Sequence, residues 1–472
     1  MTVESMLSTP TPPTPPTPPT PAPGQAGASL PPLAPGAAPL LGHAPQMLRD
    51  PLAFLTRLRD GGDVVRLRLG PKTVFAVCDP VLVEKLLKSP DFLVGGALWD
   101  TLEVLLGEGV ATSNGQKHRR QRRAIQPAFR AERMADHASL MAEEAQAAAD
   151  RWQDGQTVDI NAEMFRLAAR ITARAMLHID AEDDRSDRFG ETMGTVFAGM
   201  YRRMILSFGP LYRLPLPANR RFERAMAELH RMVDEIIVER RAQAAEGIDT
   251  GDLLVALLDA HDDDGEAVTD QEIHDQVLAL LLAGGENISK TLAWTLGLLA
   301  EHPDHERRLY EEVESATGGD RQVAFGDLGE LAYMRNLLTE SMRIRPSVWI
   351  FTRVSGVDTE LGGYRIPAGT DIVYSPYAMQ HDPRSFDDVD VFDPDRWLPE
   401  RVTDAANVAH QPFGTGNRKC PGDHFSMVEL TLILGTLVSR WRFEQAPETD
   451  ATAKLGITIG PKNGNLRVRA RG

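Results

Sequence analysis

The chain has few cysteines, since Cys78 and Cys420 are the two among its 472 residues. Two cysteines are too few for a disulfide framework and suit a reducing compartment. The sequence also lacks a run of about 20 apolar residues that would span a bilayer, and it lacks a basic-then-apolar secretory signal. Its formal net charge of −16 argues against a nucleic-acid-binding surface. We therefore expect a cytoplasmic protein with no transmembrane segment and no nucleic-acid partner.

Proline and threonine are concentrated at one end of the chain. The run from Thr9 to Pro23 is almost entirely Thr and Pro, and Gly- and Ala-rich sequence follows to Ala38. Such a tract favours extended polyproline geometry and cannot bury a core. Beyond it we find no linker, charge block or internal repeat. The sequence therefore predicts a disordered tail over residues 1–38 and a single domain over residues 39–472.

Hydrophobic periodicity predicts a mainly α protein with a minor β region. Apolar residues recur three and four apart from Ala131 to about residue 300. Thr269 and Glu272 form a capping box, and His302-Pro303 stops the helix that begins there, so this helix is roughly 50 Å long. The segment 64–77 reads as a β-hairpin, and a small β unit is expected at 362–374.

The strongest chemical signal is the run from Phe413 to Gly422, which contains Arg418 and Cys420 and precedes an apolar helical pattern. Backbone N–H groups of a Gly-rich loop that opens a helix stabilise a thiolate. A thiolate here can ligate a metal or act as a nucleophile. A buried structural cysteine is the alternative, but it suits Cys78 better, because it does not explain the glycines and the arginine beside Cys420.

This run resembles the haem-binding loop of the cytochromes P-450, Phe-x-x-Gly-x-Arg-x-Cys-x-Gly, and matches it at every fixed position, Phe413 included. The resemblance implies the cytochrome P-450 fold, with haem b held between the long central helix and the cysteine loop with its helix. It also implies that Cys420 is the ligand of the haem iron.

Further segments resemble the same family. Glu340 and Arg343 look like its Glu-x-x-Arg pair, and Arg396 matches the arginine that completes this buried network. His118 and Arg122 match, four residues apart, two partners of the haem propionates. Arg353 and Arg418 match two more, and guanidinium groups suit carboxylates.

The middle of the long helix carries Ala283-Gly284-Gly285-Glu286-Asn287, which resembles the family's oxygen-binding segment. By this resemblance Glu286 is the acid that helps to deliver protons. Asn287 stands where the family usually has Thr. A carboxamide donates a hydrogen bond but is a poorer proton relay than a hydroxyl. We therefore expect Glu286 and Asn287 to be catalytic, with protons moving through water held by both.

An apolar substrate pocket is expected beside the haem. In the family the residues after the Glu-x-x-Arg pair line it, which here are Val348, Trp349, Ile350 and Phe351. Ala283, Gly284 and Thr458 are expected to complete it. For any one of these residues, a place in the ordinary core is the alternative.

The resemblance implies a monooxygenase that inserts one oxygen atom from O2 into an apolar small molecule. Electrons would come from NAD(P)H through a ferredoxin or flavodoxin and its reductase. The basic residues Arg119, Arg120, Arg123 and Lys419 are either a docking patch for that partner or ordinary solvated charge.

For the substrate, the chain resembles bacterial sesquiterpene oxidases. This implies allylic hydroxylation of an epi-isozizaene-like sesquiterpene hydrocarbon, with further oxidation to a ketone as a second step. A fatty acid or another lipophile is an alternative substrate. A different activity is suggested by the acidic run from Asp262 to Glu266, which resembles the magnesium-binding motif of terpene cyclases, although such a run is more often an exposed turn.

Overall fold

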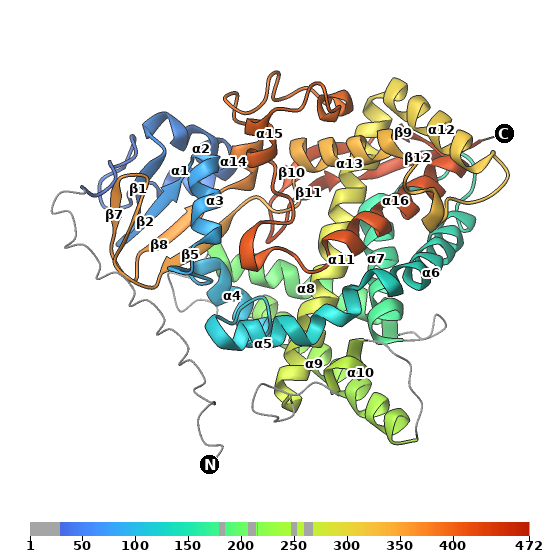
Figure 1. The fold of residues 1–472 in the computed structure, drawn as a ribbon, viewed down its shortest axis with the longest axis horizontal. Coiled ribbons are helices and arrows are strands. Elements are labelled where there is room, and N and C mark those ends of the chain that lie inside the picture. The colour runs from blue at the N-terminus through green and yellow to red at the C-terminus, as the bar shows by residue number, and fades with distance from the viewer. Residues whose placement is uncertain are drawn as a thin grey trace, which may run out of the picture.

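The structure is a computed structural model that describes residues 29–178, 185–205, 214, 216–246, 253–258 and 268–471. Most of this part of the chain is helical, and a mixed β-sheet is gathered at one end of the molecule, on the left of Figure 1. The mainly α class with a minor β region is therefore confirmed.

The largest sheet has the strand order β1-β2-β8-β5-β3. Its strands are β1 Val64–Leu69, β2 Lys72–Val77, β8 Asp371–Tyr374, β5 Phe351–Ser355 and β3 Phe92–Leu93. The predicted hairpin is confirmed, because β1 and β2 pair antiparallel. Gly70, with a φ of 61°, makes its turn.

The smaller sheets join segments that are distant in the sequence. One has the order β4-β12-β9, and two more pair β6 with β7 and β10 with β11. Their bounds are β4 Thr157–Asp159, β6 Thr359–Leu361, β7 Tyr364–Ile366, β9 Trp441–Gln445, β10 Asp450–Lys454, β11 Gly460–Asn463 and β12 Asn465–Ala470. The β unit expected at 362–374 is thus divided between two sheets, and β4 interrupts the predicted helical region.

The end of the predicted tail packs on the sheet. The backbone N–H of Arg66 donates to the carbonyl of Pro32 at 2.7 Å, and the N–H of Ala34 donates to the carbonyl of Arg66 at 2.9 Å. Ala34 is only 2% exposed. Residues 29–38 therefore belong to the body, and the tail boundary drawn after Ala38 is corrected. A proline-rich segment can pair with β1 in this way because proline lacks a backbone N–H but keeps a carbonyl that accepts a hydrogen bond.

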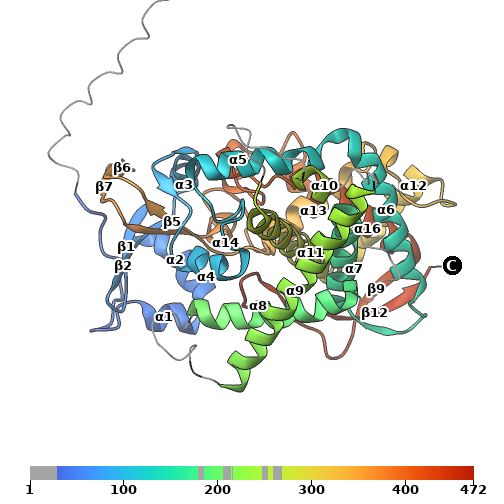
Figure 2. The ribbon, with the colours of Figure 1, turned by 90° about the horizontal axis from the view of Figure 1, so that it is seen from below.

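The long helix is α11, Asp270–Glu301, and both of its predicted ends are confirmed. Thr269 and Glu272 form the capping box, and His302 is the C-cap. In Figures 1 and 2, α11 runs through the middle of the helical part. It packs along α7, Ile160–Leu177, and against α16, Asp423–Arg440.

The remaining helices surround this centre. In the first half of the chain they are α1 Ala44–Arg49, α2 Pro51–Arg57, α3 Pro80–Lys88, α4 Ala97–Leu106, α5 Gly115–Ile125, α6 Ala131–Asp150 and α8 Arg185–Ile205. In the second half they are α9 Pro217–Ala245, α10 Leu253–Leu258, α12 Pro303–Thr317, α13 Ala332–Ile344, α14 Pro376–Gln380 and α15 Asp404–Ala409. Among the described residues, none of the helices is long and apolar enough to cross a membrane.

Candidate active site

Cys420 lies on the loop that leads into α16. The loop holds a short 3-10 turn, η6 Gly416–Arg418, and the N–H of Cys420 donates to the carbonyl of Phe413 at 2.8 Å. Gly416 has a φ of 69°, and a Cβ there would lie 2.8 Å from the carbonyl oxygen of Leu87. Only glycine fits this close approach without strain. The loop therefore has one defined shape, which turns Cys420 toward a cavity.

This cavity, of about 330 Å³, lies between the cysteine loop and α11. Phe413, Arg418 and Cys420 line one side of it, and Ala283 and Gly284 on α11 line the other. At Gly284 a Cβ would lie 2.3 Å from the hydroxyl oxygen of Thr172 on α7. The packing of α11 on α7 therefore requires glycine at position 284, whether or not the cavity also needs the space.

The surroundings of Cys420 act on its thiol in opposite directions. Burial raises the pKa of Cys420, and Asp423 adds to this, whereas a hydrogen bond from the backbone of Gly422 and the charges of Arg122 and Lys419 lower it. Burial dominates, so the expected N–H stabilisation is present but does not alone make a thiolate. Coordination to a metal ion would deprotonate the thiol outright.

Four basic residues converge on one edge of the cavity. His118, Arg122, Arg353 and Arg418 all line it, from α5, β5 and the cysteine loop. Arg418 is held by hydrogen bonds to the carbonyl of Ser113 at 2.6 Å and to Oδ1 of Asn114 at 2.9 Å. Within the described chain, no carboxylate forms an ion pair with any of these arginines.

Burial and the neighbouring positive charges lower the pKa of two of these residues, His118 and Arg418. Burial and the charges of Arg418, Arg122 and Arg119 lower the pKa of His118 to about 4. Burial and the charges of Arg353 and Arg122 lower the pKa of Arg418 to about 10. Cations gathered in a buried place without a protein anion indicate an anionic ligand.

These residues fit a haem. Two porphyrin carboxylates would meet the basic cluster, and the iron would meet the sulfur of Cys420. The structure thus brings together the predicted cofactor residues His118, Arg122, Arg353, Phe413, Arg418 and Cys420 around one cavity.

Glu286 and Asn287 point in different directions from α11. Asn287 lines the cavity, whereas Glu286 does not. Oε1 of Glu286 accepts a 2.5 Å hydrogen bond from the hydroxyl of Thr458 and lies 3.7 Å from Nζ of Lys290. Thr458 does not line the cavity either, so its assignment to the substrate pocket is corrected. The reason is that its hydroxyl is used to hold Glu286.

The four residues after α13 divide in the same way. Val348 and Phe351 line the cavity, but Trp349 and Ile350 do not. Trp349 is 2% exposed, and its ring N–H donates to the carbonyl of Gly456 at 3.1 Å. Together with Ile350 it belongs to an apolar cluster that includes Phe54. Their assignment to the pocket is corrected, because the extended chain turns them toward this second core.

The lining also includes residues that the sequence analysis did not assign to it. Among them are eight apolar residues and three with hydroxyl groups: Val94, Trp99, Val110, Ala111, Thr172, Met176, Ala279, Leu280, Ile288, Thr291 and Ser347. The place of Thr291 in the lining could have been predicted from the sequence, since it lies one helical turn after Asn287 on the same face. The sequence contains no comparable pattern for residues 94–111 and 172–176, because only the fold brings them to α11.

The predicted charge network is assembled beneath this site. Arg343 donates to both carboxylate oxygens of Glu340 at 2.8 Å, and both side chains are 0% exposed. Arg396 donates to Glu340 at 3.4 Å. A buried ion pair is tolerated where every polar group has a partner. Here the carbonyls of Gln380, Val389 and Val391 accept hydrogen bonds from the remaining N–H groups of Arg343, which ties α13 to the segment before Arg396.

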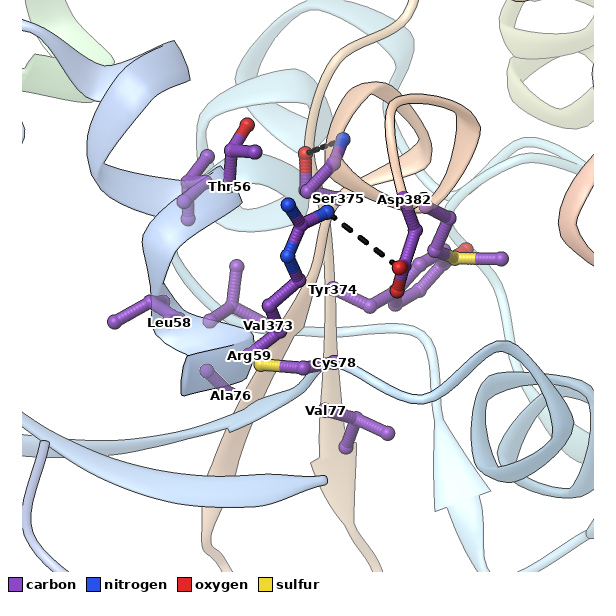
Figure 3. A pocket seen from close by; sticks show the side chains of 13 residues that line it. Thr56, Leu58, Arg59, Ala76, Val77, Cys78, Val373, Tyr374, Ser375 and Asp382 are labelled. Atoms are coloured by element: carbon purple, nitrogen blue, oxygen red, sulfur yellow. Dashed lines mark hydrogen bonds and ion pairs between the residues drawn. The ribbon is translucent and has the colours of Figure 1, made fainter. Parts of the chain in front are cut away.

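Cys78 lies in a different and much smaller pocket (Figure 3). This pocket has a volume of about 20 Å³. Arg59 and Asp382 form an ion pair beside it at 3.5 Å. It has no room for a cofactor, so Cys78 is a structural residue.

The acidic run from Asp262 to Glu266 lies outside the described residues. In the part of the chain that the structure describes, no group of three or more His, Cys, Asp or Glu side chains is placed to hold a metal ion.

Comparisons with known proteins agree with this geometry. The family model "Cytochrome P-450" matches residues 31–468. The chain is 42% identical to cyclooctatin synthase of Streptomyces melanosporofaciens, over 91% of this chain and 94% of that protein. It is 39% identical to pentalenene oxygenase of Streptomyces avermitilis, over 93% and 97%. A solved cytochrome P-450 haem domain superposes with a TM-score of 0.84 at 27% identity, covering 94% of this chain and 99% of that one. The chain belongs to the cytochrome P-450 family and is a P-450 monooxygenase, an oxidoreductase.

Proposed function

We propose that this monooxygenase hydroxylates a polycyclic terpene hydrocarbon, of sesquiterpene size, at an allylic carbon, with oxidation on to the ketone as a further step. One observation carries the proposal. The basic residues among the described lining of the cavity are His118, Arg122, Arg353 and Arg418, and all four lie at the edge that suits the haem carboxylates. Among the described lining residues on the α11 side, none is a cation that could hold the carboxylate of a fatty acid.

The relatives support a terpene but do not choose its size. The two reported above are named for cyclooctatin and for pentalenene, and the chain is nearly equally similar to both. The apolar wall, with Met176, Leu280, Ile288 and Val348, suits a hydrocarbon of either kind.

When bound, haem b supplies the activation of O2 and the insertion of one oxygen atom into a C–H bond. The residues of the chain do the rest. Cys420 would ligate the iron, and the basic cluster would hold the carboxylates. Val348 and Phe351 orient the substrate and exclude water. The amide of Asn287 offers a hydrogen bond at the point where α11 faces the cavity, and Glu286 lies one residue away, behind that wall.

Electrons are proposed to come from NAD(P)H through a ferredoxin or flavodoxin and its reductase. Of the proposed basic patch, Arg119 and Arg123 on α5 are exposed. Arg120, on the same helix, pairs with Glu272, whereas Lys419 lies outside α5, 2.5 Å from Asp423. The docking patch is therefore proposed to centre on α5. The scarcity of cysteine supports a cytoplasmic location.

The substrate proposal is tested by titrating the haem-loaded protein with a sesquiterpene hydrocarbon and, in parallel, with a fatty acid of similar size. An apolar molecule that displaces water from the iron changes the spin state, which absorbance reports. We expect saturation at lower concentration for the terpene. The methyl ester of the fatty acid is the matched control, because it removes the charge and keeps the chain. Tighter binding of the free acid than of both neutral compounds would contradict the proposal.

Terpene cyclase activity through the run at Asp262 is the other reading of the sequence. Incubation with farnesyl diphosphate and Mg²⁺, without reductant, separates it from oxygenase activity, because a cyclase needs no electrons. A cyclic product that disappears in Asp262→Asn would establish this second activity.

A further inference from the structure

A serine outside α11 holds the one amide that α11 turns into the cavity. Ser347 and Asn287 both line the cavity, and the hydroxyl of Ser347 donates to Oδ1 of Asn287 at 3.3 Å. The two residues are 60 positions apart. This contact joins the segment after α13 to the middle of the long helix.

The orientation of the amide follows from its two contacts. Nδ2 of Asn287 donates to the carbonyl of Ala283 at 3.4 Å. A carbonyl can only accept, so a rotation of the amide by 180° would place two oxygens against each other. In this orientation the Ser347 hydroxyl donates to Oδ1 and so holds the end of the side chain in place. Within the described residues, no acceptor is recorded for the second hydrogen on Nδ2, which leaves a donor for a molecule in the cavity.

Ser347 is itself fixed by the turn between β10 and β11. Its carbonyl accepts a hydrogen bond from the N–H of Ile459 at 2.8 Å. The preceding residue in that turn, Thr458, holds Glu286 at 2.5 Å. The turn between β10 and β11 therefore contacts Glu286 directly and contacts Asn287 through Ser347. It keeps the carboxylate of Glu286 behind the cavity wall and supports the residue that aims the amide of Asn287 into the cavity.

We infer that Ser347 is a positioning residue for catalysis, which keeps the N–H group of Asn287 directed into the cavity, where it would meet a ligand of the haem. This inference rests on the proposed function and deepens it. In this chain, the hydroxyl that the usual Thr would bring is replaced by two residues, an amide that donates and a serine that orients it.

The test uses the haem-loaded, reduced protein with carbon monoxide as the probe. The infrared stretching band of bound CO depends on hydrogen bonding and local charge at the ligand. We expect one narrow band for the wild type. Ser347→Ala removes the hydrogen bond to Oδ1, which lowers the population of the observed side-chain rotamer relative to others by roughly five-fold. The band should therefore broaden or split, and product formed per NAD(P)H should fall. Ser347→Thr keeps the hydroxyl and should restore both.

Ser355→Ala is the matched control. The Ser355 hydroxyl donates to the carbonyl of Val357 at 2.6 Å, is buried, and does not line the cavity. Its band should equal that of the wild type. A Ser347→Ala band identical to the wild type, or one that Ser347→Thr fails to restore, would overturn the positioning role. An unchanged band in Asn287→Ala would overturn the inference at its premise, while an intact thiolate absorption would leave the proposed function standing. A wild type without that absorption would overturn both.

Discussion

Cys78 and Cys420 are both partly buried, and both precede a helix. They differ in what surrounds the sulfur. Burial and the carboxylates of Asp63, Asp382 and Asp79 raise the pKa of Cys78 to about 12, with Arg384 as the opposing charge. At Cys420 the opposing contributions are a backbone N–H and two cations.

The spaces beside the two sulfurs differ as well. Cys420 faces a cavity of about 330 Å³ with a basic edge, whereas Cys78 faces one of about 20 Å³ that is lined by the Arg59–Asp382 pair (Figure 3). Burial alone therefore does not distinguish a ligand cysteine from a structural one. Space for the ligand, and positive charge around it, do.

The largest effect should come from replacing the sulfur itself. Cys420→Ser should abolish the thiolate absorption of the reduced CO complex and the oxygenase activity, because a serine hydroxyl is a weak ligand of iron at neutral pH. Cys78→Ser should keep both. The measurement is the CO difference spectrum of the two variants. A normal spectrum in Cys420→Ser would show that another residue ligates the iron.

The second effect concerns the two arginine environments. Arg418→Ala removes a charged partner of the haem carboxylates, so the dissociation constant of haem should rise about 10- to 100-fold. Arg59→Ala breaks the pair beside Cys78 and should lower thermal stability without changing haem affinity. Transfer of haem to apomyoglobin measures the first, and thermal unfolding of the apoprotein measures the second. Equal haem loss in both variants would remove the distinction between the two pockets.

A smaller effect should appear on acidification. His118 has a folded pKa of about 4, below its ordinary value of 6.5, so between these values the unfolded chain binds a proton that the folded chain does not. The stability that neutral His118 contributes is present above about pH 6.5 and is lost as the pH falls toward 4. The carboxylates of haem would raise this pKa, so the haem-loaded protein should lose less stability.

Melting temperatures at pH 7 and pH 5, with and without haem, measure this difference. His118→Gln is neutral at both pH values and isolates the contribution of His118 from that of other groups. If the pH dependence of the apoprotein is the same in His118→Gln, the basic cluster does not act on His118 as described.

Much of this contrast could be predicted from local sequence. The loop around Cys420 has fixed residues at fixed spacing, and the capping box at Thr269 and Glu272 defines the start of α11 within one residue. Both depend on interactions between residues near one another in the chain, which a sequence pattern can show.

The direction of single side chains could not be predicted. Val348, Trp349, Ile350 and Phe351 look alike in the sequence, yet the outer two line the cavity and the inner two join another core. Thr458 lies 172 positions from its partner Glu286. Such contacts depend on how distant elements pack, and no local periodicity encodes them.

The packing of residues 29–38 on the sheet could not be predicted either, because their composition resembles that of the tail. Removing part of this segment should have the smallest effect. Ala34 belongs to the apolar cluster against which Cys78 packs. A chain that begins at residue 29 keeps the hydrogen bonds between this segment and Arg66, whereas one that begins at residue 36 loses them and exposes the cluster. The second truncation should therefore melt a few degrees lower, since each lost hydrogen bond contributes about 1 kcal/mol.

Starting the chain at residue 36 should also make Cys78, but not Cys420, react faster with a thiol reagent. The rate is best measured on the haem-loaded protein, where iron protects Cys420, with Cys78→Ser in each truncation as the blank. Equal rates for the two truncations would mean that residues 29–35 do not shield Cys78. Faster reaction of both cysteines would mean that the loss spreads to the haem site, and that the two regions are not independent.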